Sequence, residues 1–192
     1  MKRVVHRVWL LCMCLALCSS LLCCARQSRP SALEAVLAMS AAQPACPAGE
    51  IYLLPHSYSL QTIDRTESTS LGLRLADDAL LQALLGKASS TSARDPAVWE
   101  CSPDLVDDGA LRLATAQSPC ELIVLHCVSR SHTSRVADLL LHRLELLRRE
   151  YRATDFEHIL AHAQVMILGK FVILVVCAAP EHCLSVARRT LS

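Results

Sequence analysis

The feature that most constrains the fold is an apolar segment near the middle of the chain, residues 121–128, which reads ELIVLHCV. Only Glu121 and His126 interrupt its aliphatic character. A short run of this kind, without polar alternation, is typical of a strand that is covered on both faces. The fold must therefore place this strand inside a layered structure.

The next segment, residues 134–152, predicts a long amphipathic helix. Apolar residues recur at helical spacing and form one face; they are Val136, Leu139, Leu140, Leu144, Leu147 and Tyr151. Its arginines gather toward the C-terminal end, where the helix dipole favours cations. This segment therefore supplies a helix that can pack on a sheet.

A second apolar stretch, residues 163–179, is compatible with a membrane helix or with a β-hairpin. Its 17 residues are fewer than a spanning helix needs, which is roughly 20. Gly169 followed by Lys170 suits a two-residue type II′ turn, because that turn takes glycine at its first central position. We therefore expect a hairpin with strands over 165–168 and 171–176.

The remaining elements rest on shorter signals. Ser31 and Glu34 form a capping box at the start of a helix. The further elements that we expect are a helix over 33–42, a strand over 50–54, a helix over 75–85, strands over 98–101 and 110–114, a short helix after the capping box of Thr154 and Glu157, and a terminal helix over 180–191 with Pro180 in its first turn.

Two pairs of adjacent carboxylates lie between these elements. Asp77 and Asp78 are expected to open the helix over 75–85, where the helix dipole favours acids. Asp107 and Asp108, followed by Gly109, are expected to form a turn between two strands.

These patterns predict an α+β fold. We expect an antiparallel or mixed sheet with the long amphipathic helix packed on one face, preceded by an N-terminal signal segment. The expected organisation is a signal peptide over residues 1–23, a tether and short helix over 24–44, and a single α+β domain over 45–192.

The N-terminal segment has the layout of a secretory signal peptide. Lys2, Arg3 and Arg7 precede a charge-free run from residue 8 to residue 24, and the first acid in the chain is Glu34. A basic segment followed by an apolar one directs export. Because the apolar run is near the length that spans a bilayer, an uncleaved signal anchor is the alternative.

The end of this segment, Leu21-Leu22-Cys23-Cys24, resembles the lipobox of bacterial lipoproteins. Cleavage before Cys24 lets its thiol take a diacylglyceryl group, and two acyl chains hold a protein stably on a membrane. Ordinary cleavage after Ala25 is the alternative. We expect lipidation at Cys24 and a cell-membrane location on the extracytoplasmic face.

Charge and composition exclude several classes of protein. Removing residues 1–23 takes away three of the 19 basic residues and none of the 18 acidic ones, which leaves 16 minus 18, a net charge of −2. This balance does not steer the domain to nucleic acid. The chain has only five glycines and no phosphate-binding or dinucleotide fingerprint, so no cofactor is expected.

Six cysteines remain after the signal peptide and Cys24, and their pairing stays open; they are Cys46, Cys101, Cys120, Cys127, Cys177 and Cys183. An even number in an exported domain suggests disulfides. Cysteines in or beside apolar strands also pack as free, small hydrophobic residues. No Cys-x-x-Cys occurs, so we expect neither a zinc ribbon nor a thioredoxin-type site.

Histidines are the first candidates for chemistry. His126 lies in the apolar strand and is expected to be a hydrogen-bonded core or edge residue rather than a general base. His158 and His162 are spaced i, i+4 and share a helix face, which makes them weak candidates for metal ligands without an identifiable third ligand. We therefore assign no catalytic residue and no metal site.

A group of arginines is a weak candidate for anion binding: Arg148, Arg149 and Arg152. Glu145 lies four residues before Arg149, a spacing that favours an ion pair on a solvated helix face. The anion site and the solvated face are alternative readings of the same residues.

Several segments together carry a resemblance to a known family. They are residues 119–125 at a strand start, the helix with Val136, Leu140 and Arg143, the break at Tyr151, and the strand pair around residues 169–172. Over residues 45–178 the chain resembles a domain-of-unknown-function family of small exported lipoproteins of Gram-positive anaerobic bacteria. The resemblance implies an extracytoplasmic, membrane-tethered α+β domain and implies no activity.

We therefore expect a membrane-anchored lipoprotein whose domain is a non-enzymatic module that binds a protein or a small-molecule ligand. One alternative is an anchored hydrolase-like enzyme that uses His126 or the His158/His162 pair. The other is an uncleaved, signal-anchored protein with the same domain.

Overall fold

The computed structural model describes residues 30–44, 46–58, 72–85, 88–89, 98–99, 104–114 and 117–192. The expected signal peptide over residues 1–23, the lipidation site Cys24, the alternative cleavage site at Ala25 and the cysteine at position 101 lie outside the described residues.

The described part of the chain is built around a six-stranded mixed sheet, which confirms the predicted α+β class. Its strands are β1 (Gly49–Leu53), β2 (Leu73–Leu75), β5 (Val106–Ala114), β6 (Glu121–Cys127), β7 (Gln164–Leu168) and β8 (Phe171–Val176). The strand order is β2-β1-β5-β6-β8-β7. Neighbours pair antiparallel except β1 and β2, which are parallel.

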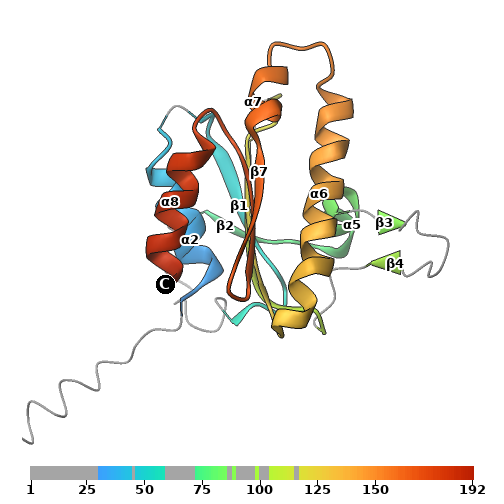
Figure 1. Cartoon of the computed structure of the whole chain (residues 1–192), viewed down its shortest axis with the longest axis vertical. Helices are drawn as coiled ribbons and strands as arrows, with labels where there is room; N and C mark the ends of the chain where they lie inside the picture. The colour runs from blue at the N-terminus through green and yellow to red at the C-terminus, as the bar shows by residue number, and fades with distance from the viewer. Residues whose placement is uncertain are drawn as a thin grey trace, which may run out of the picture.

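Helices cover both faces of this sheet, as the apolar run of β6 requires (Figure 1). One face carries α2 (Ala32–Ala41) and α8 (Pro180–Leu191), which pack side by side. The other carries α5 (Asp78–Leu85), α6 (Thr133–Glu150) and α7 (Glu157–His162), and the 3₁₀ turn η1 (Arg130–His132) leads into α6. Two short strands, β3 (Ala88–Ser89) and β4 (Val98–Trp99), pair with each other.

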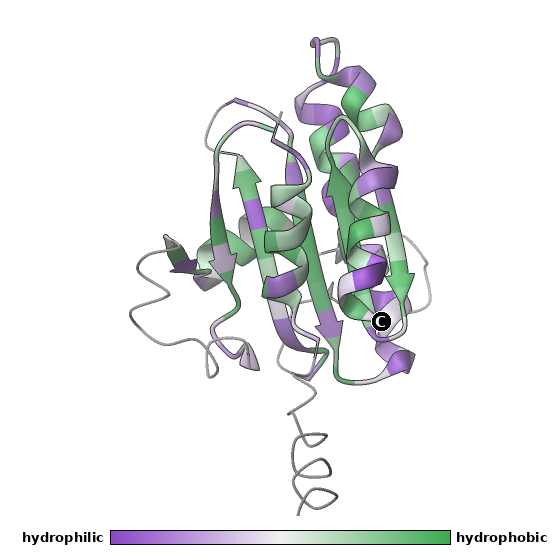
Figure 2. Ribbon diagram, turned by 90° about the vertical axis from the view of Figure 1, so that its left-hand side faces the viewer, coloured by the Kyte–Doolittle hydropathy of each residue, from purple (hydrophilic) through white to green (hydrophobic). Residues whose placement is uncertain are grey.

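The sheet separates two apolar cores, because successive side chains of a strand point to opposite faces. In β6, Ile123 and Leu125 join the core under α6, while Leu122 and Val124 join the core under α2 and α8. Figure 2 shows the resulting pattern, with mostly apolar strands between helices in which hydrophilic and hydrophobic residues are mixed. All seven residues of β6 are buried.

The hairpin of β7 and β8 and the terminal helix are confirmed. Gly169 has φ of +62°, the value that a type II′ turn requires at its first central position. Helix α8 spans the predicted residues and begins with Pro180. The 163–179 stretch is therefore no membrane helix.

The predicted turn at Asp107–Asp108–Gly109 is wrong, because these residues lie inside β5. Asp108 is buried and hydrogen-bonded, which removes the cost that a carboxylate would otherwise add to a strand interior. Gly109 packs against Leu54, whose Cδ1 atom would lie 2.5 Å from a Cβ at this position. Close packing, rather than a turn, accounts for the glycine.

The helix predicted over 75–85 begins three residues later than expected. Leu75 belongs to β2, and α5 starts at Asp78. The side chain of Asp77 accepts a hydrogen bond from the backbone N–H of Leu80 at 2.7 Å, so Asp77 caps the helix. The strand predicted over 98–101 is described only as β4, and its partner is β3 rather than β5.

Candidate functional site

The most chemically distinctive pair in the described residues joins β5 to β6. His126 is almost fully buried, and its Nδ1 atom is hydrogen-bonded to Asp107 Oδ1. A β-bulge between Val106 and Asp108 interrupts the register of β5 beside this pair. The His126 ring lies against Phe171, with ring centroids 4.6 Å apart, and meets the Tyr58 ring edge-on at 6.2 Å. As predicted, His126 is a hydrogen-bonded core residue.

A carboxylate at Nδ1 holds the proton on that nitrogen and leaves Nε2 as the hydrogen-bond acceptor. This is the arrangement of a histidine general base in nucleophilic catalysis. The hydroxyl of Ser57, however, gives its single proton to Asp108, the register partner of His126. Among the described residues, His126 and Asp107 are therefore arranged as in a catalytic triad, but Ser57 donates its proton to Asp108 and not to His126.

Asp108 connects three segments of the chain. Its Oδ2 atom accepts a hydrogen bond of 2.8 Å from the backbone N–H of Ala32, the first residue of α2, and its Oδ1 atom accepts from Ser57. An anion at a helix N-terminus is favoured by the unsatisfied N–H groups and the helix dipole. Asp108 therefore positions α2 against the sheet.

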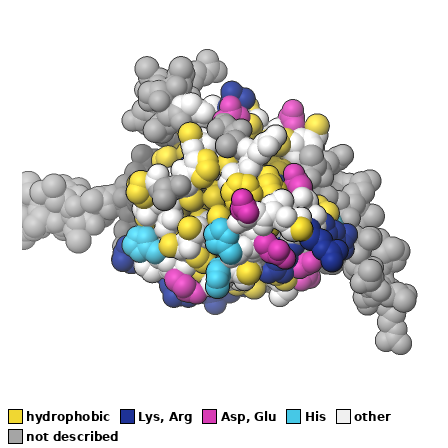
Figure 3. All heavy atoms as spheres, turned by 90° about the horizontal axis from the view of Figure 1, so that it is seen from above, with side chains coloured by type: hydrophobic (Ala, Val, Ile, Leu, Met, Phe, Trp, Pro, Cys, Tyr) yellow, Lys and Arg dark blue, Asp and Glu magenta, His cyan; other side chains and the backbone are white. Residues whose placement is uncertain are grey.

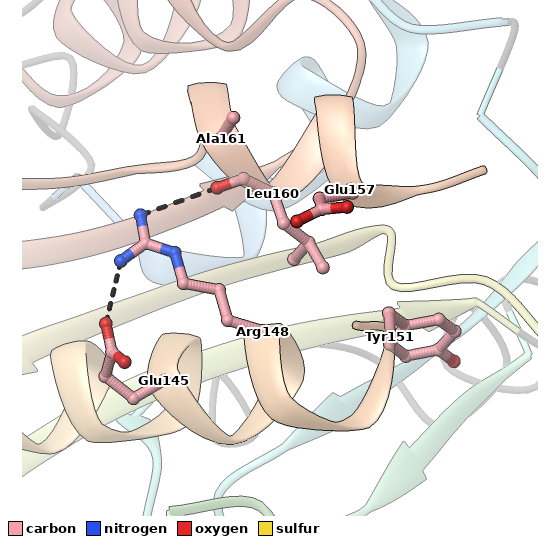
Figure 4. Close-up of a pocket in the computed structure, with 6 residues that line it drawn as sticks. All are labelled: Glu145, Arg148, Tyr151, Glu157, Leu160 and Ala161. Atoms are coloured by element: carbon pink, nitrogen blue, oxygen red, sulfur yellow. Dashed lines mark hydrogen bonds and ion pairs between the residues drawn. The ribbon is translucent and has the colours of Figure 1, made fainter. Parts of the chain in front are cut away.

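A surface pocket of about 390 Å³ lies between the C-terminal half of α6 and α7 (Figure 4). It is lined by Glu145, Arg148, Tyr151, Glu157, Leu160 and Ala161. Arg148 forms an ion pair of 2.7 Å with Glu145, and its second terminal nitrogen points to the carbonyl of Leu160 at 3.5 Å.

This geometry bears on the predicted anion site. The ion pair of Glu145 is with Arg148 rather than with Arg149, because residues three apart also meet on a helix surface. Two carboxylates and one guanidinium line the pocket, so its formal charge is negative. Arg149 and Arg152 are exposed and are not among its lining residues.

The histidines of α7 are exposed at the same end of the molecule. His158 Nδ1 is hydrogen-bonded to the carbonyl of Asp155 at 2.6 Å, and His162 lies one turn further along α7. Figure 3 looks onto this end and shows histidine side chains beside apolar and acidic groups. Among the described residues, no group of three or more His, Cys, Asp and Glu side chains is arranged to hold a metal ion.

The two edges of the sheet differ in character. β7 contains no charged residue, and 47% of Ile167 is exposed. β2 forms the opposite edge with three residues; its Arg74 pairs with Glu50 of β1 at 2.6 Å. Leu75 of β2 is also exposed, at 59%. The β7 edge is therefore the longer and less polar of the two.

Within the described residues, no helix combines the length and apolar character needed to cross a bilayer. No protein-family model, no curated protein and no solved structure matches this chain. The resemblance to small exported lipoproteins therefore stays an expectation.

Sequence reasoning singled out His126 and both aspartates but not their arrangement, and it missed Ser57 and Tyr58. Neither residue lies in a periodic or capping pattern, because both follow β1 in a short irregular segment. The apolar β7 edge was visible only as one strand of a hairpin, since strand order decides which strand is exposed.

Proposed function

We propose that this chain is a lipid-anchored extracytoplasmic binding module, and that it captures an extended segment of a partner protein along the edge of β7. The observation that carries the proposal is an uncharged edge strand whose next-to-last residue, Ile167, is exposed. Exposed edges of this kind accept an added strand unless charge, proline or a bulge prevents it.

The hairpin register determines which backbone groups of β7 face outward. Leu168 and Phe171 flank the two-residue turn and form a hydrogen-bonded pair. Two residues further along the hairpin, Met166 and Ile173 form the next hydrogen-bonded pair. Hydrogen-bonded and non-bonded pairs alternate in an antiparallel ladder. The N–H and C=O groups of Val165 and Ile167 therefore point away from β8, toward an added strand.

Side chains around this edge favour an apolar ligand. Val165 and Ile167 project toward the face that carries α6, since Val165 packs with that core. α6 contacts β7 and exposes Leu141, with 47% of this side chain accessible. An extended segment with alternating apolar residues could cover Ile167 while its backbone pairs with β7.

The expected anchor is compatible with such a role. Seven residues, Ala25 to Ser31, separate Cys24 from the first residue of α2. Fully extended they span about 25 Å at most. A domain on this tether would stay close to the membrane surface and meet partners there.

A photo-crosslinking amino acid in place of Ile167 tests the binding role, with the same substitution of Leu75 as the matched control. Both side chains are exposed on edge strands of one sheet. We expect one discrete protein adduct from position 167 and none from position 75, and we expect the adduct to be lost when Val165, whose backbone N–H points away from β8, is replaced by proline. Equal labelling at both positions, or none at position 167, contradicts the proposal.

The anchor is tested separately. We expect Cys24→Ala to release the protein from the membrane fraction, and mass spectrometry of the mature N-terminus to find a diacylated Cys24. An unmodified chain that begins at Met1 would instead support the uncleaved signal anchor, and a chain that begins after Ala25 would support ordinary cleavage.

A hydrolase is the second candidate function, and the Asp107–His126 pair favours it. A base of this type would need a nucleophile supplied by rearrangement of Ser57 or by water. Purified protein that hydrolyses a small activated ester, with loss of the activity in Asp107→Asn, would establish the enzyme.

A further inference from the structure

Four cysteines that are far apart in sequence lie together at one end of the sheet. Cys46 precedes β1, Cys120 precedes β6, Cys177 follows β8, and Cys183 lies in the first turn of α8. We call these four residues the cysteine cluster. Cys127 lies at the opposite end of β6 and does not belong to it.

Two members of the cluster are in direct contact. The Sγ atoms of Cys177 and Cys183 are 3.7 Å apart, and both residues are completely buried. A disulfide needs about 2.05 Å between sulfur atoms, so a rotation of one or both side chains would bring these thiols to bonding distance. All described cysteines are free thiols.

Cys46 connects this buried pair to the surface. It is the only half-buried member of the cluster, since Cys120, Cys177 and Cys183 are buried. Its side chain packs against the apolar core that contains Cys177 and Cys183. A reagent from solution therefore meets Cys46 first, beside the core that holds the buried pair.

The acidities of the thiols assign their roles. A hydrogen bond between the two thiols raises the pKa of Cys177 and lowers that of Cys183, so Cys183 is the better thiolate of the pair. Burial raises the pKa of Cys46 from 9.0 to about 11. Exchange at Cys46 is therefore slow at neutral pH and accelerates as the pH rises.

We propose that the cysteine cluster is a thiol–disulfide exchange site, in which Cys46 reacts with an external disulfide and the product is a Cys177–Cys183 disulfide. The oxidant class is a disulfide, either a small molecule such as glutathione disulfide or the disulfide of an oxidoreductase. The site goes beyond the binding role at β7 and does not depend on it.

The exchange proceeds in three balanced steps. The Cys46 thiolate attacks the external disulfide RSSR, forms Cys46–S–S–R and releases RS⁻. Cys177 then passes its proton to the released RS⁻, attacks Cys46 Sγ, forms a Cys46–Cys177 disulfide and releases the second RS⁻, which takes the proton of Cys183. The Cys183 thiolate finally attacks Cys177 Sγ and frees Cys46. In sum, two thiols lose two electrons and two protons, and one RSSR becomes two RSH.

The experiment oxidises the folded full-length protein with glutathione disulfide, blocks remaining thiols with N-ethylmaleimide, and maps peptides after cleavage at glutamate. Cleavage after Glu181 separates Cys177 from Cys183, so only a disulfide keeps the two peptides together. We expect this linked pair in the wild-type protein. Its absence in folded, oxidised protein overturns the proposal.

Variants then test the route. We expect Cys46→Ser to slow formation of the linked pair by about tenfold or more, because the entry thiol is gone. Cys127→Ser is the matched control and should leave the rate unchanged. Cys183→Ser should trap a Cys46–Cys177 linkage. A Cys46→Ser protein that forms the linked pair at the wild-type rate overturns the role of Cys46, whether or not Cys183→Ser folds.

Discussion

Arg143 of α6 and Glu121 of β6 form a two-point ion pair between the helix and the sheet. Arg143 Nε donates to Glu121 Oε2 at 3.1 Å, and the Nη2 atom donates to Oε1. Only 11% of the Arg143 side chain and 7% of the Glu121 side chain are exposed. The pair fixes α6 on the sheet next to the cysteine cluster.

We predict that removing one partner of this pair destabilises the protein strongly. Glu121→Gln leaves the Arg143 guanidinium buried without its counter-charge, and such losses cost about 3–5 kcal/mol. Urea denaturation measures the change in the free energy of unfolding. The exposed pair of Arg148 and Glu145 is the control, since Glu145→Gln should cost less than about 1 kcal/mol. Similar losses at both sites would contradict the role assigned to burial.

We predict that Asp108→Ala loosens the start of α2. The substitution removes the acceptor of the Ala32 N–H and of the Ser57 hydroxyl, and an unsatisfied buried group costs about 1–3 kcal/mol. Hydrogen exchange should accelerate at Ala32 and the first turn of α2 before it does in β6. Asp104→Ala, at an exposed turn, serves as the control and should leave exchange in α2 unchanged.

We predict that the protein loses stability in alkali through its buried thiols. Burial, together with the charge of Asp107, raises the pKa of Cys127 from 9.0 to about 11. A raised pKa means that the folded state prefers the neutral thiol. The contribution of Cys127 to the free energy of unfolding is therefore complete below pH 9 and is lost as the pH rises toward about 11.

Denaturant unfolding below pH 9 and near pH 11 measures this effect. Cys127→Ala should show a smaller decline than the wild-type protein, and the residual decline should include Cys46, whose pKa is also raised to about 11. Identical pH profiles for the two proteins would contradict the prediction.

We predict that two glycine substitutions differ in their physical cause. In Gly109→Ala the new Cβ would lie 2.5 Å from Leu54 Cδ1 and 2.9 Å from Leu125 Cδ2, and such overpacking costs about 1–3 kcal/mol. In Gly169→Ala no atom lies within 4 Å, and only the positive φ adds strain.

Double substitutions separate the two causes by denaturant unfolding. A smaller residue at position 54, Leu54→Val, should recover part of the loss in Gly109→Ala and none of the loss in Gly169→Ala. Asparagine at position 169 should be better tolerated than alanine, because it adopts positive φ more readily. Rescue of both variants by Leu54→Val would contradict the assignment.

Local patterns in the sequence determined the elements that form the centre of the fold. The unbroken apolar run of β6, the helical spacing of α6, the Gly169 turn and the proline at the start of α8 each act within a few residues. Backbone geometry and short-range hydrogen bonds decide such features, so they are readable without knowledge of the rest of the chain.

The sequence pattern failed at Asp107–Asp108–Gly109, where turn-forming residues occupy a strand. The reason is tertiary, since the N-terminus of α2, 76 residues away, satisfies Asp108. A side chain that is costly in an isolated strand becomes acceptable when a distant segment completes its hydrogen bonds.

By itself, the sequence determined the α+β class and the identity of the titratable and thiol side chains, while the export signal that it predicts stays an expectation. Only the tertiary structure decided that Asp107 meets His126, that β7 is an exposed edge, and that cysteines 46, 120, 177 and 183 form one cluster. These relationships join segments that are up to 137 residues apart, from position 46 to position 183. Strand order and helix packing, which depend on the whole core, bring such segments together.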